Sequence, residues 1–298
     1  MSKAIEIINL TQSYNGSPIL NKLNMSVPEG SVYAFLGRNG AGKTTTIKLL
    51  LGLLERSAGK VKVLGLDPAL QGPELMQLIG YISEDRTFYD WMTASEAIRF
   101  TSAFYKNWDA DFASELVSRL KIRLDKKIAN LSRGEKGKLA LMLALAYRPK
   151  LLILDEPTSG LDSVVRRQFI EETVELIAHE GRTVFFSTHL IEEVERIADH
   201  VAILSQGHLV VDASQQELKD SFRRVRAYFD KAAAEQFTPP EDALNFKRTD
   251  GGIQFHIARF GDELKEKLIQ SGAKKVEASA MSLDDIFVEL TRQEDLND

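Results

Sequence analysis

The chain lacks cysteine, a signal peptide and any hydrophobic run long enough to cross a membrane. Without cysteine it can form no disulfide, no thiolate metal site and no cysteine nucleophile. Residues 1–10 contain neither the apolar core nor the small-residue cleavage site of a signal peptide. The longest strongly apolar run spans residues 139–147, whereas a transmembrane helix needs about 20 residues. We therefore expect the chain to stay in the cytoplasm, where it is made.

An excess of positive charge is also missing. Lys and Arg number 38 against 43 Asp and Glu, so the net charge is −5, which argues against a dedicated nucleic-acid binder. Any polyanion must then be held by a local group of residues. The composition is that of an ordinary folded protein, and 298 residues are enough for about two domains.

Short apolar runs alternate with longer helical patterns. Residues 31–36, 151–154 and 183–186 read as buried strands. This alternation predicts an α/β fold with a largely parallel sheet. Two apolar runs within residues 202–211, on either side of Gln206 and Gly207, predict a hairpin that closes the first domain.

Residues 93–147 read instead as consecutive helices. Trp108, Phe112, Leu116 and Leu120 recur every four residues, as on one face of an amphipathic helix. We therefore predict a first domain at residues 1–214 that contains a helical insertion. The insertion is expected at about residues 86–147.

The pattern of apolar and polar residues changes after Asp212 and predicts a small second α+β domain at residues 215–298. A turn-forming cluster at residues 237–242 separates two expected strands. The elements expected there are strands at residues 224–230, 252–257 and near Lys275, and helices at residues 262–271 and 282–292.

Residues 37–44 match the phosphate-loop pattern G-x-x-x-x-G-K-[ST], between a predicted strand and a predicted helix. Glycines let backbone N–H groups turn toward a phosphate, and the helix N-terminus adds partial positive charge. We expect Lys43 to contact the β- and γ-phosphates of ATP and Thr44 to ligate Mg²⁺. The residues assigned to nucleotide contact are Gly37, Arg38, Asn39, Gly40, Ala41, Gly42, Lys43, Thr44 and Thr45.

Two acids follow the predicted strand at residues 151–154. Asp155 lies where a carboxylate at the C-terminal edge of a parallel sheet reaches a metal ion, so we assign it to Mg²⁺. Glu156 lies one residue further and is predicted to be the general base for the attacking water. Alone, such an acid pair is as often an ordinary solvated loop, and the phosphate loop is what favours the catalytic interpretation.

Further motifs, in their order along the chain, make the sequence resemble the ATP-binding subunit of an ABC transporter. Residues 131–135 resemble the signature with the common form L-S-G-G-Q, and residues 159–162 resemble the D-loop. His189, after Ser187 and Thr188, resembles the switch histidine. The resemblance covers the whole first domain and implies a P-loop ATPase sheet with a helical subdomain, with ATP and Mg²⁺ as cofactors.

In the resembled family two such subunits dimerise head to tail, with each ATP between the phosphate loop of one and the signature of the other. The resemblance therefore assigns Ser132, Gly134 and Glu135 to the nucleotide of the partner, and Asp162 to the D-loop contact. It assigns Tyr14 to stacking on adenine. Taken singly, Tyr14 reads as an ordinary core or surface aromatic and Ser132 as a helix cap.

The sequence departs from the family pattern at two places. Glu84 stands where the family usually has glutamine; it keeps an oxygen for Mg²⁺ or water but adds negative charge beside the phosphates. In the signature, Arg133 replaces the middle glycine and Glu135 the glutamine. These changes are expected to alter the contacts of both loops with nucleotide. They do not imply a loss of activity.

Residues 281–291 resemble the C-terminal extension of ATP-binding subunits of ABC-2-type exporters. Their apolar spacing, at Leu283, Ile286, Phe287 and Leu290, also fits an ordinary amphipathic helix. The resemblance implies an ATPase on the inner face of the membrane that powers export through separate membrane subunits. It also implies a second ATP-binding subunit, which is either a second copy of the chain or a close relative. A non-transport ABC ATPase and a nucleotide-binding regulatory module are the alternatives.

Residues 87–91 hold Phe88, Tyr89 and Trp91 in a segment that reads as a surface loop. Exposed aromatic side chains are enriched at the centre of protein contacts, and in the resembled family this region faces a short cytoplasmic helix of the membrane subunit. Packing of Phe88 and Trp91 under the helical insertion is the other interpretation.

Overall fold

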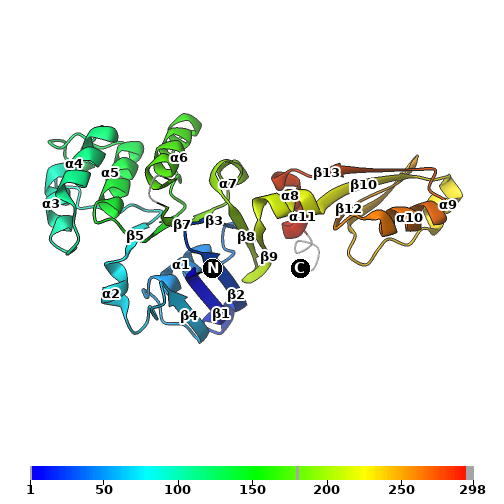
Figure 1. The fold of residues 1–298 in the computed structure, drawn as a ribbon, viewed down its shortest axis with the longest axis horizontal. Helices are drawn as coiled ribbons and strands as arrows, with labels where there is room; N and C mark the ends of the chain where they lie inside the picture. Colours follow the sequence, from blue (N-terminus) through cyan, green and yellow to red (C-terminus); the bar gives the residue numbers. More distant parts are fainter. Residues whose placement is uncertain (1, 179–180, 293–298) are drawn as a thin grey trace. The chain divides into compact units, whose positions relative to one another are not determined.

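The computed structural model describes residues 2–178 and 181–292 and divides into two compact units, Met1–Asp212 and Ala213–Asp298 (Figure 1). The division lies two residues before the boundary expected from the sequence. Within the described residues no helix is both long enough and apolar enough to cross a bilayer.

A six-stranded sheet forms the centre of the first unit, in the order β5-β6-β7-β3-β8-β9. The pairs β5–β6, β6–β7, β7–β3 and β3–β8 are parallel, and β9 returns from β8 through Gln206 and Gly207, which both have positive φ. The predicted α/β fold is confirmed. The strands are β3 (Val32–Leu36), β5 (Ile79–Ile82), β6 (Leu151–Asp155), β7 (Thr183–Thr188), β8 (His200–Ser205) and β9 (His208–Ser214).

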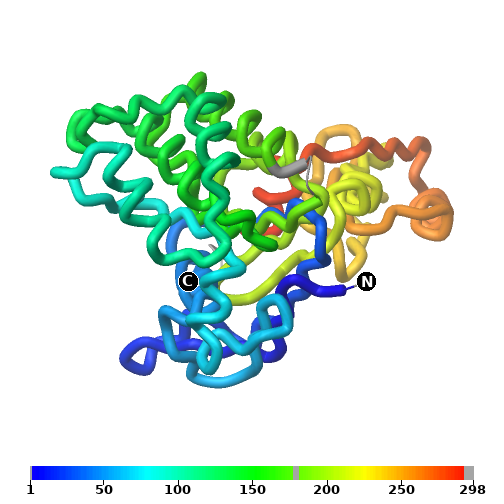
Figure 2. Tube along the Cα trace, turned by 60° about the vertical axis from the view of Figure 1, so that its left-hand side comes forward, coloured from blue at the N-terminus to red at the C-terminus, as the bar shows by residue number. Residues whose placement is uncertain are grey.

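Helices and a second sheet cover the two faces of this sheet. Because β6 and β7 are buried along their whole length, residues 151–154 of β6 and 184–186 of β7 are apolar runs without alternation. Figures 1 and 2 show α3, α4 and α5 on one side and the second sheet on the other. The helices are α1 (Lys43–Leu50), α2 (Gly72–Met76), α3 (Ala94–Ser102), α4 (Ala110–Arg119), α5 (Arg133–Leu145), α6 (Ser163–Ala178) and α7 (Ile191–Ile197), with a 3₁₀ turn η1 (Ile128–Asn130).

The second sheet, in the order β2-β1-β4, is antiparallel and was not anticipated from the sequence. It is made of β1 (Lys3–Tyr14), β2 (Ser17–Pro28) and β4 (Ala58–Val63). Asn15 and Gly16, both with positive φ, form the turn between β1 and β2. The core between the two sheets includes Ile5, Leu10, Leu20, Leu23, Tyr33, Phe35, Ile47 and Phe185, so α1 is enclosed between them.

Helix α4 begins later than the four-residue apolar repeat suggests. Phe112, Leu116 and Leu120 are buried as expected, but Trp108 lies before α4. The reason is Asp109, whose carboxylate accepts the N–H of Phe112 at 2.9 Å and caps the helix, so that α4 begins at the next residue.

The second unit contains one antiparallel sheet in the order β11-β12-β10-β13. Between its first and last helices the elements follow the order β-α-β-β-α-β along the chain, the split βαβ arrangement. Strand β11 and helices α8 and α9 had no counterpart in the sequence prediction. The elements are α8 (Gln215–Ser221), β10 (Phe222–Tyr228), α9 (Lys231–Gln236), β11 (Leu244–Thr249), β12 (Gly252–Ala258), α10 (Asp262–Gln270), β13 (Lys275–Ala280) and α11 (Leu283–Arg292).

Candidate functional site

The phosphate loop connects the end of β3 to the first turn of α1. Gly42 precedes the helix with φ 108°, a conformation that strongly favours glycine. A Cβ atom on Gly42 would lie 2.8 Å from the Leu20 side chain, and one on Gly37 would lie 2.6 Å from the carbonyl oxygen of Leu204. Glycine at these two positions therefore lets the loop pack tightly against its neighbours. The N-terminus of α1 then points toward the space that the loop encloses.

The Lys43 side chain is turned into this loop and is only 6% exposed. Its Nζ donates to the carbonyl oxygens of Gly37 (2.7 Å) and Arg38 (3.3 Å), and lies 3.0 Å from Oε1 of Glu156. The ammonium thus lies among oxygens, as it would against phosphate oxygens. The predicted Lys43 and Glu156 are brought together.

Asp155 ends β6 opposite Ser187 of β7, and its carboxylate is buried. Oδ1 accepts hydrogen bonds from Ser187 Oγ at 2.6 Å and Thr44 Oγ1 at 3.3 Å. Burial raises the pKa of Asp155, the two hydroxyls oppose this rise, and the negative charges of Glu156 and Glu84 add to it. A carboxylate in this position favours a nearby cation.

Glu156 has a left-handed backbone, with φ 45°, which costs about 1–3 kcal/mol for a residue other than glycine. Its N–H donates to Ser187 Oγ at 3.0 Å. Oε1 faces Lys43 and Oε2 lies 2.9 Å from Nδ1 of His189. Glu156 is 6% exposed, whereas the His189 side chain is 42% exposed, so the histidine forms the solvent-facing side of the pair.

The residues present fit Mg²⁺. Thr44 and Asp155 offer hard oxygen donors, and the buried carboxylate has hydroxyl donors and acidic neighbours around it. In the part of the chain that the structure describes, which leaves out His179, no group of three or more His, Asp or Glu could hold a metal ion. Mg²⁺ is commonly held by one or two protein ligands together with water and substrate phosphate.

Glu84 and the D-loop are also brought together. Ser159 Oγ donates to Glu84 Oε1 at 3.0 Å. Asp162 caps α6, because its Oδ1 accepts the N–H groups of Val164 (3.1 Å) and Val165 (3.0 Å). The Ser159 side chain therefore holds the Glu84 loop to the D-loop. The Asp162 carboxylate bonds to the first turn of the helix that follows it.

The signature residues form the start of α5. Ser132 Oγ accepts the N–H of Glu135, and the Glu135 carboxylate accepts the N–H of Ser132 at 2.7 Å, a complete capping box. That backbone N–H, with Lys126 and Arg123 beside the carboxylate, lowers the pKa of Glu135 to about 2. The glutamate in place of glutamine thus stabilises the exposed loop that carries Ser132.

Tyr14 is the last residue of β1, in the hairpin opposite Ser17, and is 44% exposed. The next strand of this hairpin packs against the phosphate loop, because Ile19 and Leu20 lie against Gly42. The aromatic ring is therefore presented on a hairpin whose second strand contacts the loop.

A buried group at the strand ends was missed by sequence reasoning. Glu193 of α7 is 3% exposed and accepts hydrogen bonds from the hydroxyls of Thr158 and Thr188, the latter at 2.7 Å. Thr158 lies two residues after Glu156, and Thr188 directly precedes His189. Burial raises the pKa of Glu193. In the sequence Glu193 is one of several acids on a short helix, which is typical of a solvated surface, so no local signal marks it.

We expect Glu193→Ala to lower the free energy of unfolding by about 1–3 kcal/mol, because two buried hydroxyls lose their acceptor. A carboxyl with a raised pKa in the folded state stabilises the fold less as pH rises from its ordinary value through the folded-state pKa. The non-titrating Glu193→Gln should therefore gain stability relative to the unsubstituted protein between pH 5 and pH 8. Urea unfolding at both pH values measures this, and a pH-independent difference would contradict it.

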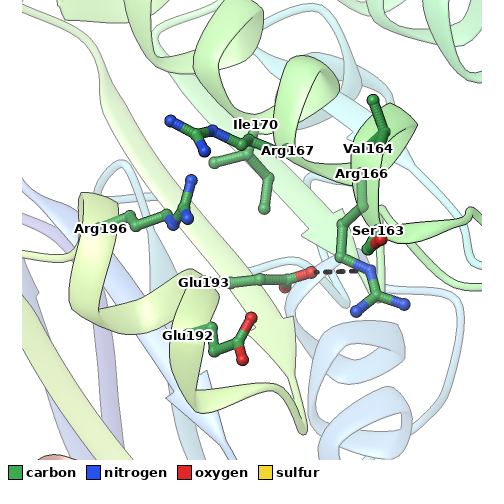
Figure 3. Close-up of a pocket in the computed structure, with 8 residues that line it drawn as sticks. All are labelled: Ser163, Val164, Arg166, Arg167, Ile170, Glu192, Glu193 and Arg196. Atoms are coloured by element: carbon green, nitrogen blue, oxygen red, sulfur yellow. Dashed lines mark ion pairs between the residues drawn. The ribbon is translucent and has the colours of Figure 1, made fainter.

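A cavity of about 370 Å³ opens beside this group, between α6 and α7 (Figure 3). The Glu193 carboxylate points toward Arg166 across 3.9 Å. No residue of the phosphate loop lines this cavity, so it is separate from the nucleotide-binding residues. Its lining residues are Ser163, Val164, Arg166, Arg167, Ile170, Glu192, Glu193 and Arg196.

Comparison with known proteins agrees with these motifs. Residues 20–159 match the ABC transporter family model. The chain is 32% identical to the bacitracin transport ATP-binding protein BcrA of Bacillus licheniformis, over 97% of this chain and 98% of that protein. It is 27% identical to the Nod factor export ATP-binding protein I of Cupriavidus metallidurans, over 99% of both.

A solved structure of an ATP-binding subunit of an ABC transporter is similar to 73% of this chain, with 28% identity and a TM-score of 0.66, over 92% of its own length. The phosphate loop, the acid pair and the capped signature helix lie on one such fold. The chain therefore belongs to the family of ABC transporter ATP-binding subunits and is an ATPase of that family.

Proposed function

We propose that the chain hydrolyses ATP to power export through separate membrane subunits. The observation that carries the catalytic part is the position of the Glu156 carboxylate, between Lys43 at 3.0 Å and His189 at 2.9 Å. The match to two export or antibiotic-transport relatives along nearly the whole chain supports the class of transporter. Phosphate release from MgATP, with and without the membrane partner, tests it.

The side chains predicted from the sequence then have these roles. Lys43 and the loop N–H groups bind the phosphates, and Thr44 and Asp155 hold Mg²⁺, which neutralises phosphate charge when bound. Glu156 accepts the proton of the attacking water. His189 orients Glu156 and contacts the γ-phosphate, and Tyr14, also a proposal, stacks on adenine.

The second half of the site is proposed to come from another copy of the chain. Ser132 is exposed at a helix N-terminus with its hydroxyl and backbone ordered by the capping box. Such an N-terminus favours negatively charged groups, which supports a contact between Ser132, Gly134 and the partner's γ-phosphate. Glu84 and Ser159 are proposed to sense whether that contact has formed.

The unit at Ala213–Asp298 is proposed to be an accessory domain of the exporter subunit. Relatives that match along nearly the whole chain include this part in their alignment. Its own hydrophobic core, which includes Val225, Phe229, Ile253 and Phe255, supports an independent fold.

An aromatic patch is proposed to receive a cytoplasmic helix of the membrane subunit, which would hold the chain on the inner face of the membrane. Tyr89 and Trp91 are 55% and 67% exposed, and the Tyr89 ring contacts Trp91 and Phe100. The exposure of Trp91 argues against packing under the helical insertion. Phe88, Tyr89 and Phe100 line a pocket of about 370 Å³ that an apolar side chain of the partner could fill.

We expect Tyr89→Ala and Trp91→Ala each to weaken copurification with the membrane subunit at least about tenfold, since hot-spot residues, among which Tyr and Trp are enriched, cost about 2 kcal/mol or more when truncated. Basal ATPase rate and melting temperature of the isolated chain should stay unchanged. Leu70→Ala, at an 81% exposed apolar residue elsewhere in the unit, is the control. A large loss of melting temperature in both aromatic variants would assign them to core packing instead.

A further inference from the structure

Arg86 is a buried arginine with no role in the mechanism above. It follows Glu84 by two residues and is 8% exposed. Its Nη2 donates to the carbonyl oxygen of Pro157, the residue after Glu156. Its Nη1 lies 3.5 Å from the carbonyl oxygen of Arg133, where α5 begins. One guanidinium thus contacts the segments of two other motifs.

Residues of α5 and α6 lie close to this guanidinium. It lies over the ring of Phe169 in α6, at 6.0 Å from the centroid. A Cβ on Gly137, inside α5, would lie 3.4 Å from the Phe169 ring and 3.6 Å from Arg86 Nη1. Both are ordinary van der Waals distances, so an alanine would also fit at this position and the packing around Arg86 does not require the glycine.

Two of the joined segments hold residues with strained backbones. Arg86 has φ 43° and Glu156 has φ 45°, and such conformations persist only where the surrounding contacts enforce them. Burial lowers the pKa of Arg86, as does the charge of Arg133, while Glu84 opposes them. The guanidinium nevertheless remains charged, so removal of its acceptors would be costly and the three segments are expected to move together.

We propose that Arg86 is a positioning residue that couples the Glu84 loop and the segment after Glu156 to the signature helix of the same chain. This inference rests on the proposed function, in which that signature serves the nucleotide bound by the partner subunit. Through Arg86, a movement of the Glu84 loop at one nucleotide shifts the Arg133 end of α5, which faces the other. The link makes the two sites of the dimer dependent on each other.

The proposed link requires a planar guanidinium rather than a positive charge alone. The carbonyl oxygens of Pro157 and Arg133 are reached by two different nitrogens. A lysine has a single ammonium on a flexible stem and cannot span both acceptors in a fixed geometry. Arg86→Lys is therefore the informative variant, since it retains the charge and most of the buried volume.

The test uses the full chain with Arg86→Lys and Arg86→Ala. We expect kcat for ATP hydrolysis to fall at least about tenfold in both, with KM changed by less than about threefold, because binding residues are untouched. In the unsubstituted protein MgATP should change amide hydrogen exchange at residues 133–139, and this change should be lost in both variants. Arg56→Lys, at a bidentate pair with Asp67 (2.8 and 2.7 Å), controls for loss of an ordinary structural arginine.

Two results would overturn the proposal. One is a kcat per folded molecule that stays within twofold while the melting temperature falls, as in a purely structural role. The other is an exchange change at residues 133–139 that is absent from the unsubstituted protein or persists in Arg86→Lys. If the unsubstituted protein binds MgATP without hydrolysing it, the proposed function fails, and the exchange experiment still decides the role of Arg86.

Discussion

Glu156→Gln should bind MgATP and lose at least about a hundredfold in kcat, because general-base catalysis commonly contributes a factor of 10² to 10⁴. The amide keeps the size of the side chain but cannot accept the proton of water at neutral pH. It also removes the charge that lies 3.0 Å from Lys43, which frees the ammonium for phosphate. We therefore expect unchanged or tighter ATP binding and a dimer that persists while ATP is present.

Phosphate release, nucleotide binding and size-exclusion chromatography with and without MgATP measure these three effects. Glu192→Gln, at an exposed acid on α7, is the matched control and should behave as the unsubstituted protein. An unchanged turnover in Glu156→Gln would exclude Glu156 as the base and direct attention to His189 or Glu84.

Lys43→Ala should fail at an earlier step, the binding of nucleotide. Hydrogen bonds to a charged group contribute about 1.5–3 kcal/mol, so ATP affinity is expected to fall by roughly one to two orders of magnitude. The variant also removes the ammonium beside the buried Glu156 and leaves His189 as its neighbour, and loss of one partner of a buried ion pair destabilises a fold. A lower melting temperature without ligand should therefore accompany the weaker binding.

Calorimetric titration with ATP below the melting temperature separates these two effects. Lys48→Ala, at an exposed lysine on the same helix, tests whether loss of one positive charge on α1 suffices. Wild-type affinity in Lys43→Ala would show that the phosphate loop has been assigned wrongly.

Strands of the central sheet could be predicted because they are buried on both faces. A fully buried parallel strand contains a continuous apolar run, as at residues 151–154 of β6 and 184–186 of β7. The antiparallel sheet was missed because its strands do not alternate regularly. Register shifts interrupt the pairing of β1 with β2, and Asn9 and Lys22 have positive φ within these strands, so the apolar residues change phase.

The phosphate loop and the acid pair could be identified because their chemistry requires neighbouring residues in the chain. Ser187, Glu193 and Arg86 act through contacts with residues 31 to 71 positions away. Only the strand order, with Asp155 opposite Ser187, brings such residues to one edge of the sheet. That order depends on packing of the whole unit, which no local pattern contains.

The left-handed backbone of Glu156 has a consequence for the order of the two acids. It lets the two adjacent carboxylates reach different places in the site. The shorter aspartate ends in the closed space beside Ser187, and the longer glutamate extends to His189. Exchanging Asp155 and Glu156 would crowd the inner position by one methylene and leave the outer carboxylate one methylene short. A pair with the same composition and charge would then be sterically unable to perform both tasks.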